Sequence, residues 1–231
     1  MSISQAAIDL IIQSEISGRE AYETRYKWPT WPGGASGVTI GIGYDLGYQT
    51  QNEIKRDWKA LSNYALNKLA AASGVTGAEA KDYLPGMRDV TVPWDNAMGV
   101  FINHDIPKWE AICAAKLPNW DKLPEDCKGA LVSLAYNRGP SFTTPGDRYR
   151  EMRAIRENMI SGNLKAIPDD IRAMKRLWPD VKGLRIRREA EAYLFQKGLD
   201  DDARTSYGAV ADNNSGPGND SHGVWGWVNV S

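Results

Sequence analysis

Apolar residues recur at helical spacing along most of the chain, and the first such run is the clearest. In residues 5–18 the isoleucines Ile8, Ile11, Ile12 and Ile16 fall three or four positions apart, which predicts an amphipathic helix with Ser4 as its N-cap. Gly18 predicts the end of this helix. The same spacing predicts helices at 52–72, 77–84, 125–136, 148–161, 167–177 and 183–195. It also predicts helical structure on both sides of Pro107, from the apolar residues Ala97, Val100, Phe101, Ile106, Trp109 and Ile112.

A pattern of period two appears at 38–44, where Ile40 and Ile42 alternate with Gly41 and Gly43. Such alternation is typical of a strand, and the glycines leave room for another group to approach the backbone. Asp45 follows, before a turn at Leu46-Gly47. The patterns together predict an α+β chain that is mostly helical and has one small sheet.

Two carboxylates flank this first part of the chain. Glu15 lies four residues after Ile11 and shares its face of the helix, and loss of hydration there favours the protonated form that a general acid needs. Asp45 lies in a polar turn that favours the ionised form. Glycoside hydrolysis uses such a pair, although spacing in sequence does not give their separation in space. The other interpretation, that Glu15 is a solvated residue at the edge of the helix, stays open.

Glu15, Tyr22 seven residues later and the strand Thr39-Ile40-Gly41-Ile42-Gly43 resemble the active-site stretch of phage-type lysozymes. This superfamily includes T4-like muramidases, phage endolysins and the lysozyme domain of the bacteriocin pesticin. T4-like members carry the catalytic aspartate before the threonine, where this chain has no acidic residue between Pro32 and Val38. In the pesticin-like branch the aspartate follows by six residues, and Asp45 matches that position. Glu20 and Glu23 are the alternative second carboxylates.

Two later stretches extend the resemblance. Residues 131–139, LVSLAYNRG, are similar to the endolysin segment A-L-x-S-F-x-F-N-x-G. Trp178 and the run from Gly183 to Phe195 are similar to the closing motif W-x(n)-G-L-x-x-R-R-x-x-E-x-x-L-F. The resemblance therefore spans residues 8–195, with a poorer fit at 58–88.

The resemblance implies a lysozyme-like fold with a small β-sheet lobe, a larger helical lobe and a cleft between them. It implies hydrolysis of the β-1,4 bond between N-acetylmuramic acid and N-acetylglucosamine in peptidoglycan, with no cofactor and no metal. Glu15 is then the general acid, Asp45 the base or electrostatic stabiliser, and Thr39 the residue that positions water. The expected substrate-binding residues are Tyr22, Tyr44, Asn137 and Arg138, although Asn137 and Arg138 could equally cap a helix.

Three other activities remain open at this point. A lytic transglycosylase would cleave the same bond with one essential carboxylate. A chitinase-type hydrolase would cut glycans that lack peptide stems. A non-catalytic wall-binding module would bind sacculi and release nothing.

The composition of the chain argues against some classes of function. The chain has 231 residues with a net charge of −1 and its basic residues spread out, which argues against a nucleic-acid binder. Nine Trp and ten Tyr against three Phe suit a sugar-binding cleft, and equally a core. Cys113 and Cys127 are expected as buried thiols, and the isolated His104 and His222 give no metal-binding spacing. For Arg187, Arg188 and Glu191 a salt-bridge network is favoured over a substrate-facing cluster.

The domain prediction is a catalytic domain at 1–207 and a flexible tail at 208–231, rich in Gly and Asn and ending in Val224-Trp225-Gly226-Trp227-Val228. Residues 1–5 lack a signal-peptide pattern, and no run approaches the length of a membrane helix. We therefore expect a monomer made in the cytoplasm that acts on glycan strands in the periplasm. A holin, a secretion machine or an immunity protein are the expected partners, depending on whether the chain is an endolysin, a bacteriocin or an antibacterial effector.

Overall fold

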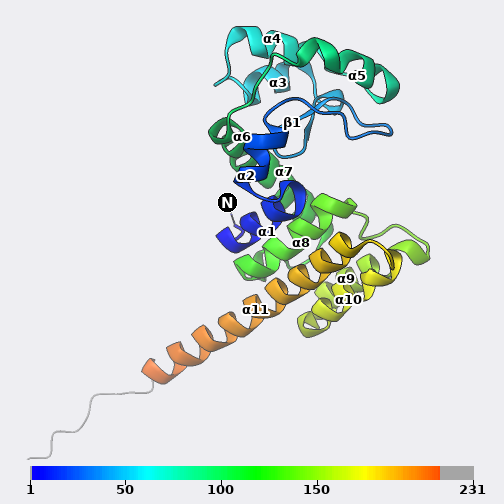
Figure 1. Cartoon of the computed structure of the whole chain (residues 1–231). Coiled ribbons are helices and arrows are strands. Elements are labelled where there is room, and N and C mark those ends of the chain that lie inside the picture. Colours follow the sequence, from blue (N-terminus) through cyan, green and yellow to red (C-terminus); the bar gives the residue numbers. More distant parts are fainter. Residues whose placement is uncertain (1, 214–231) are drawn as a thin grey trace, which may run out of the picture.

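The computed structural model describes residues 2–213 and consists mainly of helices (Figure 1). The α-helices are α1 (Gln5–Ile16), α2 (Arg19–Ala21), α3 (Gln51–Asp57), α4 (Asn63–Ala71), α5 (Gly77–Tyr83), α6 (Trp94–Val100), α7 (Ile106–Lys116), α8 (Glu125–Arg138), α9 (Arg150–Ser161), α10 (Ile167–Ala173) and α11 (Lys182–Asn213). The strands β1 (Thr39–Ile40) and β2 (Tyr44–Asp45) form a two-stranded antiparallel sheet. This arrangement confirms the predicted mostly helical α+β class.

Shorter helical turns connect these elements. Within residues 2–213, π-helical turns occupy Tyr22–Tyr26 and Phe101–Asp105. The 3-10 turns are Leu46–Tyr48, Leu84–Met87, Trp120–Lys122, Asp147–Tyr149, Leu164–Ala166 and Met174–Leu177.

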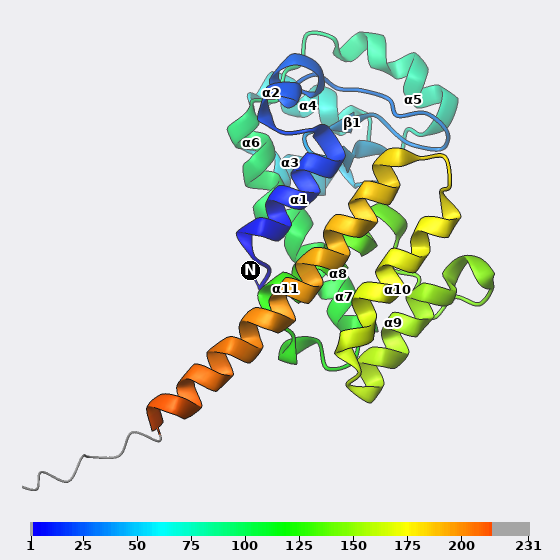
Figure 2. The same ribbon diagram turned by 60° about the horizontal axis from the view of Figure 1, so that its bottom comes forward.

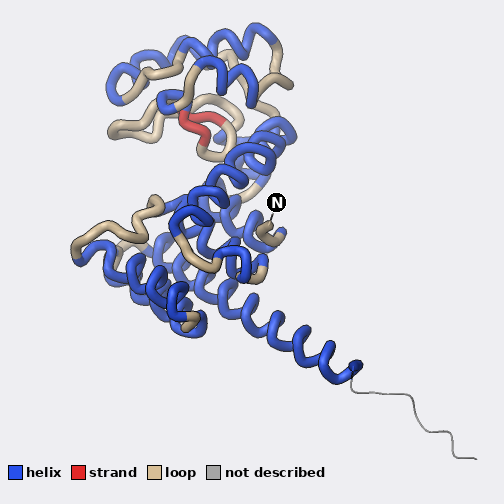
Figure 3. The backbone as a smooth tube through the Cα atoms, turned by 180° about the vertical axis from the view of Figure 1, so that it is seen from behind, coloured by secondary structure: helices blue, strands red, loops and turns tan. Residues whose placement is uncertain are grey.

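The elements form two lobes, which Figure 3 shows from behind. The hairpin of β1 and β2 lies with α3, α4 and α5 at one end, and α8 to α11 lie at the other (Figure 1). Helices α1, α6 and α7 lie between them. The predicted small sheet lobe and larger helical lobe are therefore both present.

Helix α8 is the centre of the larger lobe. Every residue from Cys127 to Ala135 except Lys128 is buried, and the helix packs against α1, α7 and α11. Gly129 permits the close crossing with α1, because a Cβ atom there would lie 2.1 Å from the Cβ of Ala7. Both cysteines are buried and free, as predicted.

The start of α1 follows the sequence rules. Ser4 caps it by accepting a hydrogen bond from the backbone N–H of Ala7 at 3.2 Å, and Ile8, Ile11 and Ile16 are buried. The helix ends where Ser17 adopts a left-handed conformation with φ 58°. The end thus falls one residue before the predicted stop at Gly18.

Three predicted boundaries are wrong. The helix expected at 52–72 is broken into α3 and α4, because Trp58 turns into the core and Ser62 caps a new helix. The strand expected at 38–44 is a hairpin that turns at Gly41 to Gly43. The helix expected at 183–195 continues as α11 to Asn213.

The predicted boundary at 207 lies inside α11, and residues 214–231, with Trp225 and Trp227, lie outside the described residues. Leu199 is partly buried against the core, and Lys197 pairs with Asp126 of α8 at 2.9 Å. No helix within residues 2–213 has the length and apolar content that crossing a membrane requires.

A chain that ends at Tyr207 is expected to fold and to keep its activity. It retains Leu199 and the Lys197–Asp126 pair, which hold α11 against the rest of the domain. Residues 202–205 are exposed, so α11 no longer packs on the domain by the point of the cut. Thermal unfolding followed by circular dichroism, with a lysis assay, checks this expectation. A truncated chain without a cooperative transition would show that Trp225 and Trp227 belong to the core.

Candidate active site

Glu15 lies in the last turn of α1 with about a quarter of its side chain exposed, at 25%. Its Oε1 accepts a hydrogen bond from Nη1 of Arg187 at 2.5 Å. Ile11 and Ile12 on the same helix are buried. The helical spacing predicted a carboxylate enclosed by isoleucines. The structure instead shows a carboxylate held by a cation.

Arg187 is itself fixed by a buried network between α8 and α11. Its Nε donates to Oε1 of Glu191 at 3.1 Å, and its Nη2 donates to the carbonyl oxygen of Ser133 at 3.1 Å. Glu191 also accepts from the Ser133 hydroxyl at 2.7 Å and pairs with Arg188 at 2.9 Å. The predicted salt-bridge network is confirmed. Its link to Glu15 was not predicted, although Arg187 lies in the closing motif.

Thr39 and Asp45 face each other across the hairpin as paired residues of β1 and β2. Side chains of such a pair lie on the same face of the sheet, about 5 Å apart at Cβ. The register thus brings two of the three predicted catalytic residues together. Both side chains are partly exposed.

The Asp45 carboxylate is also bound by its own hairpin. Oδ1 accepts from the backbone N–H of Gly47 at 2.9 Å, and Oδ2 accepts from that of Gly37 at 3.0 Å. Burial raises the pKa of Asp45, and these two N–H groups oppose the rise. These two donors are what favours the ionised form that the polar turn predicted.

Gly41 and Gly43 make room for two aromatic side chains of the protein. Gly41 has φ +61°, and a Cβ atom there would lie 2.6 Å from the Trp58 ring. Gly43 has φ +85°, and its Cβ would lie 2.9 Å from the Tyr136 hydroxyl. The groups that approach this backbone are thus side chains of the protein itself, the Trp58 ring and the Tyr136 hydroxyl.

Tyr136 connects the hairpin to the helical lobe. Its hydroxyl donates to the carbonyl oxygen of Ile42 at 2.6 Å. Burial raises the pKa of Tyr136 well above its usual value, and the charges of Asp105 and Glu15 raise it further. Glu15 and the turn of the hairpin thus share Tyr136 as a neighbour. Tyr136 was not among the predicted site residues, although it directly precedes Asn137 in the endolysin-like segment.

Tyr22 and Tyr44 are buried in the conformation described, and their contact with substrate stays a prediction. The Tyr22 hydroxyl donates to the carbonyl oxygen of Val92 at 2.9 Å. The Tyr44 hydroxyl donates to Asp57 at 2.9 Å, and its ring meets Trp58 edge to face. Both tyrosines position the small lobe from within.

Asn137 and Arg138 lie at the end of α8 and point to different places. Asn137 is exposed, accepts a hydrogen bond from Arg188 at 3.1 Å and lines the same groove as Glu15. The guanidinium of Arg138 is stacked between Tyr149 and Trp178, at 5.4 and 5.3 Å from their ring centres. Burial lowers the pKa of Arg138. Of the two, Asn137 is the one that lines the groove of Glu15.

The groove runs between α1 and α11, which lie side by side in Figure 2, and has a volume of about 1230 Å³. We call it the α1–α11 groove. Its lining residues are Ala6, Asp9, Leu10, Gln13, Ser14, Glu15, Ser17, Asn137, Val181, Gly183, Leu184, Ile186, Arg187, Ala190, Tyr193, Leu194 and Lys197. Glu15 and Asn137 therefore both line this open groove.

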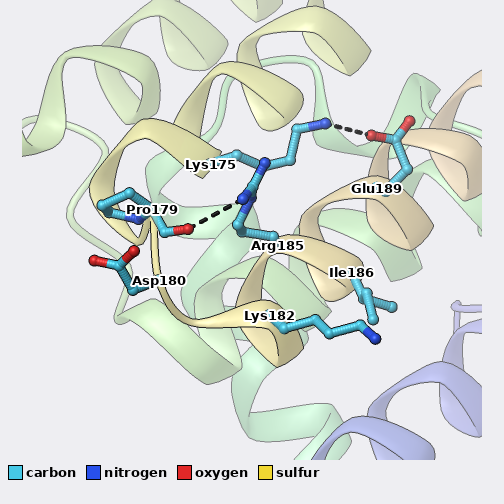
Figure 4. Close-up of a pocket in the computed structure, with 7 residues that line it drawn as sticks. All are labelled: Lys175, Pro179, Asp180, Lys182, Arg185, Ile186 and Glu189. Atoms are coloured by element: carbon cyan, nitrogen blue, oxygen red, sulfur yellow. Dashed lines mark hydrogen bonds and ion pairs between the residues drawn. The ribbon is translucent and has the colours of Figure 1, made fainter.

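A smaller hollow of about 340 Å³ lies at the start of α11 (Figure 4). Lys175 pairs there with Glu189 at 2.7 Å, and Arg185 donates to the carbonyl oxygen of Pro179 at 3.0 Å. None of the predicted site residues lines it, although Ile186 lines both this hollow and the α1–α11 groove.

A second polar cluster lies behind the hairpin. Asp57, which accepts from Tyr44, also lies 3.3 Å from Nδ1 of His104. Burial raises the pKa of the neighbouring Asp105 to about 7, and Lys108 opposes the rise while Asp57 adds to it. Within the described residues no group of His, Cys, Asp and Glu has the arrangement of a metal site.

Comparison with known proteins gives a family and a fold. A family model described as Domain of unknown function (DUF8812) matches residues 12–190. The crystal structure of the active form of the P1 phage endolysin Lyz is similar, with a TM-score of 0.51 and 20% identity, over 86% of this chain and 87% of that one. No curated protein matches the chain. The lysozyme-like fold expected from the motifs is confirmed, while the pesticin-like branch stays a prediction.

Asp105 is expected to make stability fall with rising pH. The unfolded chain releases this proton near pH 3.8, whereas the folded chain keeps it up to about pH 7, so the free energy of unfolding decreases between these values. Asp105→Asn should therefore raise Tm by several degrees at pH 8 and change it little at pH 4. Calorimetry of this variant beside Asp95→Asn, an exposed control on α6, checks the expectation. Equal gains at both pH values would contradict it.

Proposed function

This chain belongs to the DUF8812 family, whose function is unknown, and we propose that it is a peptidoglycan hydrolase of the N-acetylmuramidase type. The proposed reaction is cleavage of the β-1,4 bond between N-acetylmuramic acid and N-acetylglucosamine. The observation that carries the proposal is the placement of Glu15 on a lysozyme-like fold. It lies at the end of α1, is held by Arg187 and opens onto the α1–α11 groove.

Glu15 protonates the leaving glycosidic oxygen in this mechanism, and Arg187 orients the carboxyl group. Because Arg187 is held on two other sides by Glu191 and Ser133, it restricts Glu15 to a narrow range of positions. Arg187 also offsets the negative charge that forms on Glu15 when the proton has left.

Asp45 activates the attacking water or stabilises the oxocarbenium-like centre, and Thr39 helps to hold that water. Their pairing across β1 and β2 supports this division of roles. The hydrogen bonds from Gly37 and Gly47 favour the ionised form of Asp45 that either role requires.

A lytic transglycosylase is the second candidate, and one observation favours it. Both Asp45 oxygens already accept backbone hydrogen bonds, so the carboxylate could serve the hairpin alone. Such an enzyme needs Glu15 and forms an anhydro-muramic product without water. Mass spectrometry of the muropeptides released from purified sacculi separates the two candidates.

We place the action of the protein on glycan strands of the cell wall, in the periplasm. Release by a holin and export by a secretion machine are the two routes that we propose, and an immunity protein would belong with the second. No cofactor takes part in the proposed mechanism.

Glu15→Gln is expected to lower turnover by at least roughly 100-fold, because the amide keeps the size of the side chain but has no proton of the required acidity. The chain should still fold, because Arg187 keeps Glu191 as an ionic partner when its pair with Glu15 is lost. Release of soluble muropeptides measures the loss. The matched control is Asp9→Asn, a second acidic residue of α1 that lines the same groove, which should stay active. Near-normal clearing of sacculi by Glu15→Gln would remove the basis of the assignment.

Asp45→Asn is expected to abolish turnover almost completely while binding to sacculi persists, because Asn keeps an acceptor oxygen for the hairpin but carries no charge. Glu20→Gln and Glu23→Gln should remain active. A pull-down with sacculi and a turnover assay give the two readouts. If Asp45→Asn hydrolyses normally and one of the glutamate variants is inactive, the second carboxylate precedes the strand. If all three are active, the transglycosylase is the better candidate.

A further inference from the structure

The α1–α11 groove has two chemically different ends. Glu15, Asn137 and Arg187 line the end near the hairpin. We call the other end, formed by Ala6, Asp9, Leu10, Ala190, Tyr193, Leu194 and Lys197, the distal half. Because Ala6 lies nine residues before Glu15 on α1, the two ends are separated by roughly 14 Å.

Large apolar side chains on α11 remain uncovered along this groove. Ile186 is 58% exposed and Tyr193 is 67% exposed. In the distal half Leu10 and Ala190 are partly exposed as well. Tyr193 thus stands uncovered beside Leu10 and Ala190, with the exposed Asp9 and Lys197 next to them, and an apolar surface rimmed by polar residues can mark a binding site.

The chain carries a segment of matching chemistry after α11. Val224-Trp225-Gly226-Trp227-Val228 is apolar, and the ten residues from Asn214 to Gly223 that precede it include no large apolar residue. Tryptophan fills an apolar groove with a large flat ring while its N–H seeks an acceptor. The Asp9 carboxylate at the rim offers one.

We propose that Val224–Val228 binds in the distal half of the α1–α11 groove of the same molecule. The chain after Asn213 is long enough for this segment to reach the distal half. Ala190 lies 23 residues before Asn213 on α11, or roughly 35 Å along the helix. The 14 residues from Asn214 to Trp227 span at most about 46–50 Å when extended, so they can return this far.

The same lengths favour the distal half over the far end of the groove, because the connection becomes more extended toward Gly183. Gly183 lies 30 residues before Asn213, or roughly 45 Å, which would require an almost fully extended connection. A segment bound in the distal half leaves the Glu15 end open to substrate. This proposal is independent of the proposed hydrolase activity, and it agrees with the expectation that a chain ending at Tyr207 remains active.

Disulfide trapping tests the proposal on the full chain. Ala190→Cys and Val228→Cys are combined, which preserves both tryptophans, and Cys113 and Cys127 do not compete because they are buried. The matched control pairs Val228→Cys with Asp202→Cys. Asp202 is exposed, is nearer to the segment along the chain and lies nine residues after Tyr193, on the opposite face of α11.

We expect an intramolecular disulfide at Ala190→Cys that forms at least roughly tenfold faster than at Asp202→Cys in dilute protein, identified by mass spectrometry. Equal or faster trapping at Asp202→Cys would overturn the proposal, because a segment that is not docked reacts sooner with the nearer site. Disulfide-linked dimers at Ala190→Cys would also overturn it, since they assign the groove to a second copy.

A thermal measurement gives an independent result. Trp225→Ser with Trp227→Ser should lower Tm by about 2–4 °C, the scale of one lost packing contact in a chain of this size. Tyr193→Ala should lower Tm in the native chain and have little further effect in the double serine variant, because both changes remove the same contact. Fully additive effects would contradict docking at Tyr193.

Discussion

The ion pair between Glu15 and Arg187 is the contact on which the candidate site depends. It joins the end of α1 to the first turns of α11, two helices that are far apart in the sequence. Arg187 is buried, and so are Glu191 and Arg188 beside it. Buried charges of this kind are stable only when each has a partner, and removing one partner typically costs about 3–5 kcal/mol. The network therefore fixes both the packing of α8 on α11 and the position of the Glu15 carboxylate.

The second constraint is the attachment of the hairpin to the helical core. Tyr136 of α8 donates to the carbonyl oxygen of Ile42, and Trp58 packs over Gly41. Each aromatic ring occupies space that a side chain on the hairpin would fill. The glycines thus let the hairpin lie against the helices, which sets where Thr39 and Asp45 stand relative to the rest of the molecule. The Trp58 ring also meets Tyr44 edge to face, and the Tyr44 hydroxyl donates to Asp57 inside the protein.

Motif positions alone do not tell a substrate contact from a core contact. Tyr22 and Tyr44 have the residue types and positions of substrate contacts, yet their hydroxyl groups are satisfied by Val92 and Asp57 inside the protein. Val92 is 70 residues away from Tyr22. A tyrosine is equally suited to a cleft and to a core, and only its partners distinguish the two. Asn137 and Arg138 are adjacent in the chain, but their side chains lie in different surroundings, because successive residues of a helix point in different directions.

The sequence by itself determined the helical class, the position of α1 with its Ser4 cap, the buried cysteines and the pairing of Arg188 with Glu191. Each of these depends on residues a few positions apart or on the apolar character of a single segment, which spacing records directly. Only the tertiary structure decided that 38–44 folds as a hairpin, that Arg187 reaches Glu15 and that the Asp45 carboxylate is bound by Gly37 and Gly47. Those outcomes depend on which distant surfaces meet. A hydrogen bond between residues 172 positions apart, such as that of Arg187 with Glu15, leaves no periodic pattern in the chain.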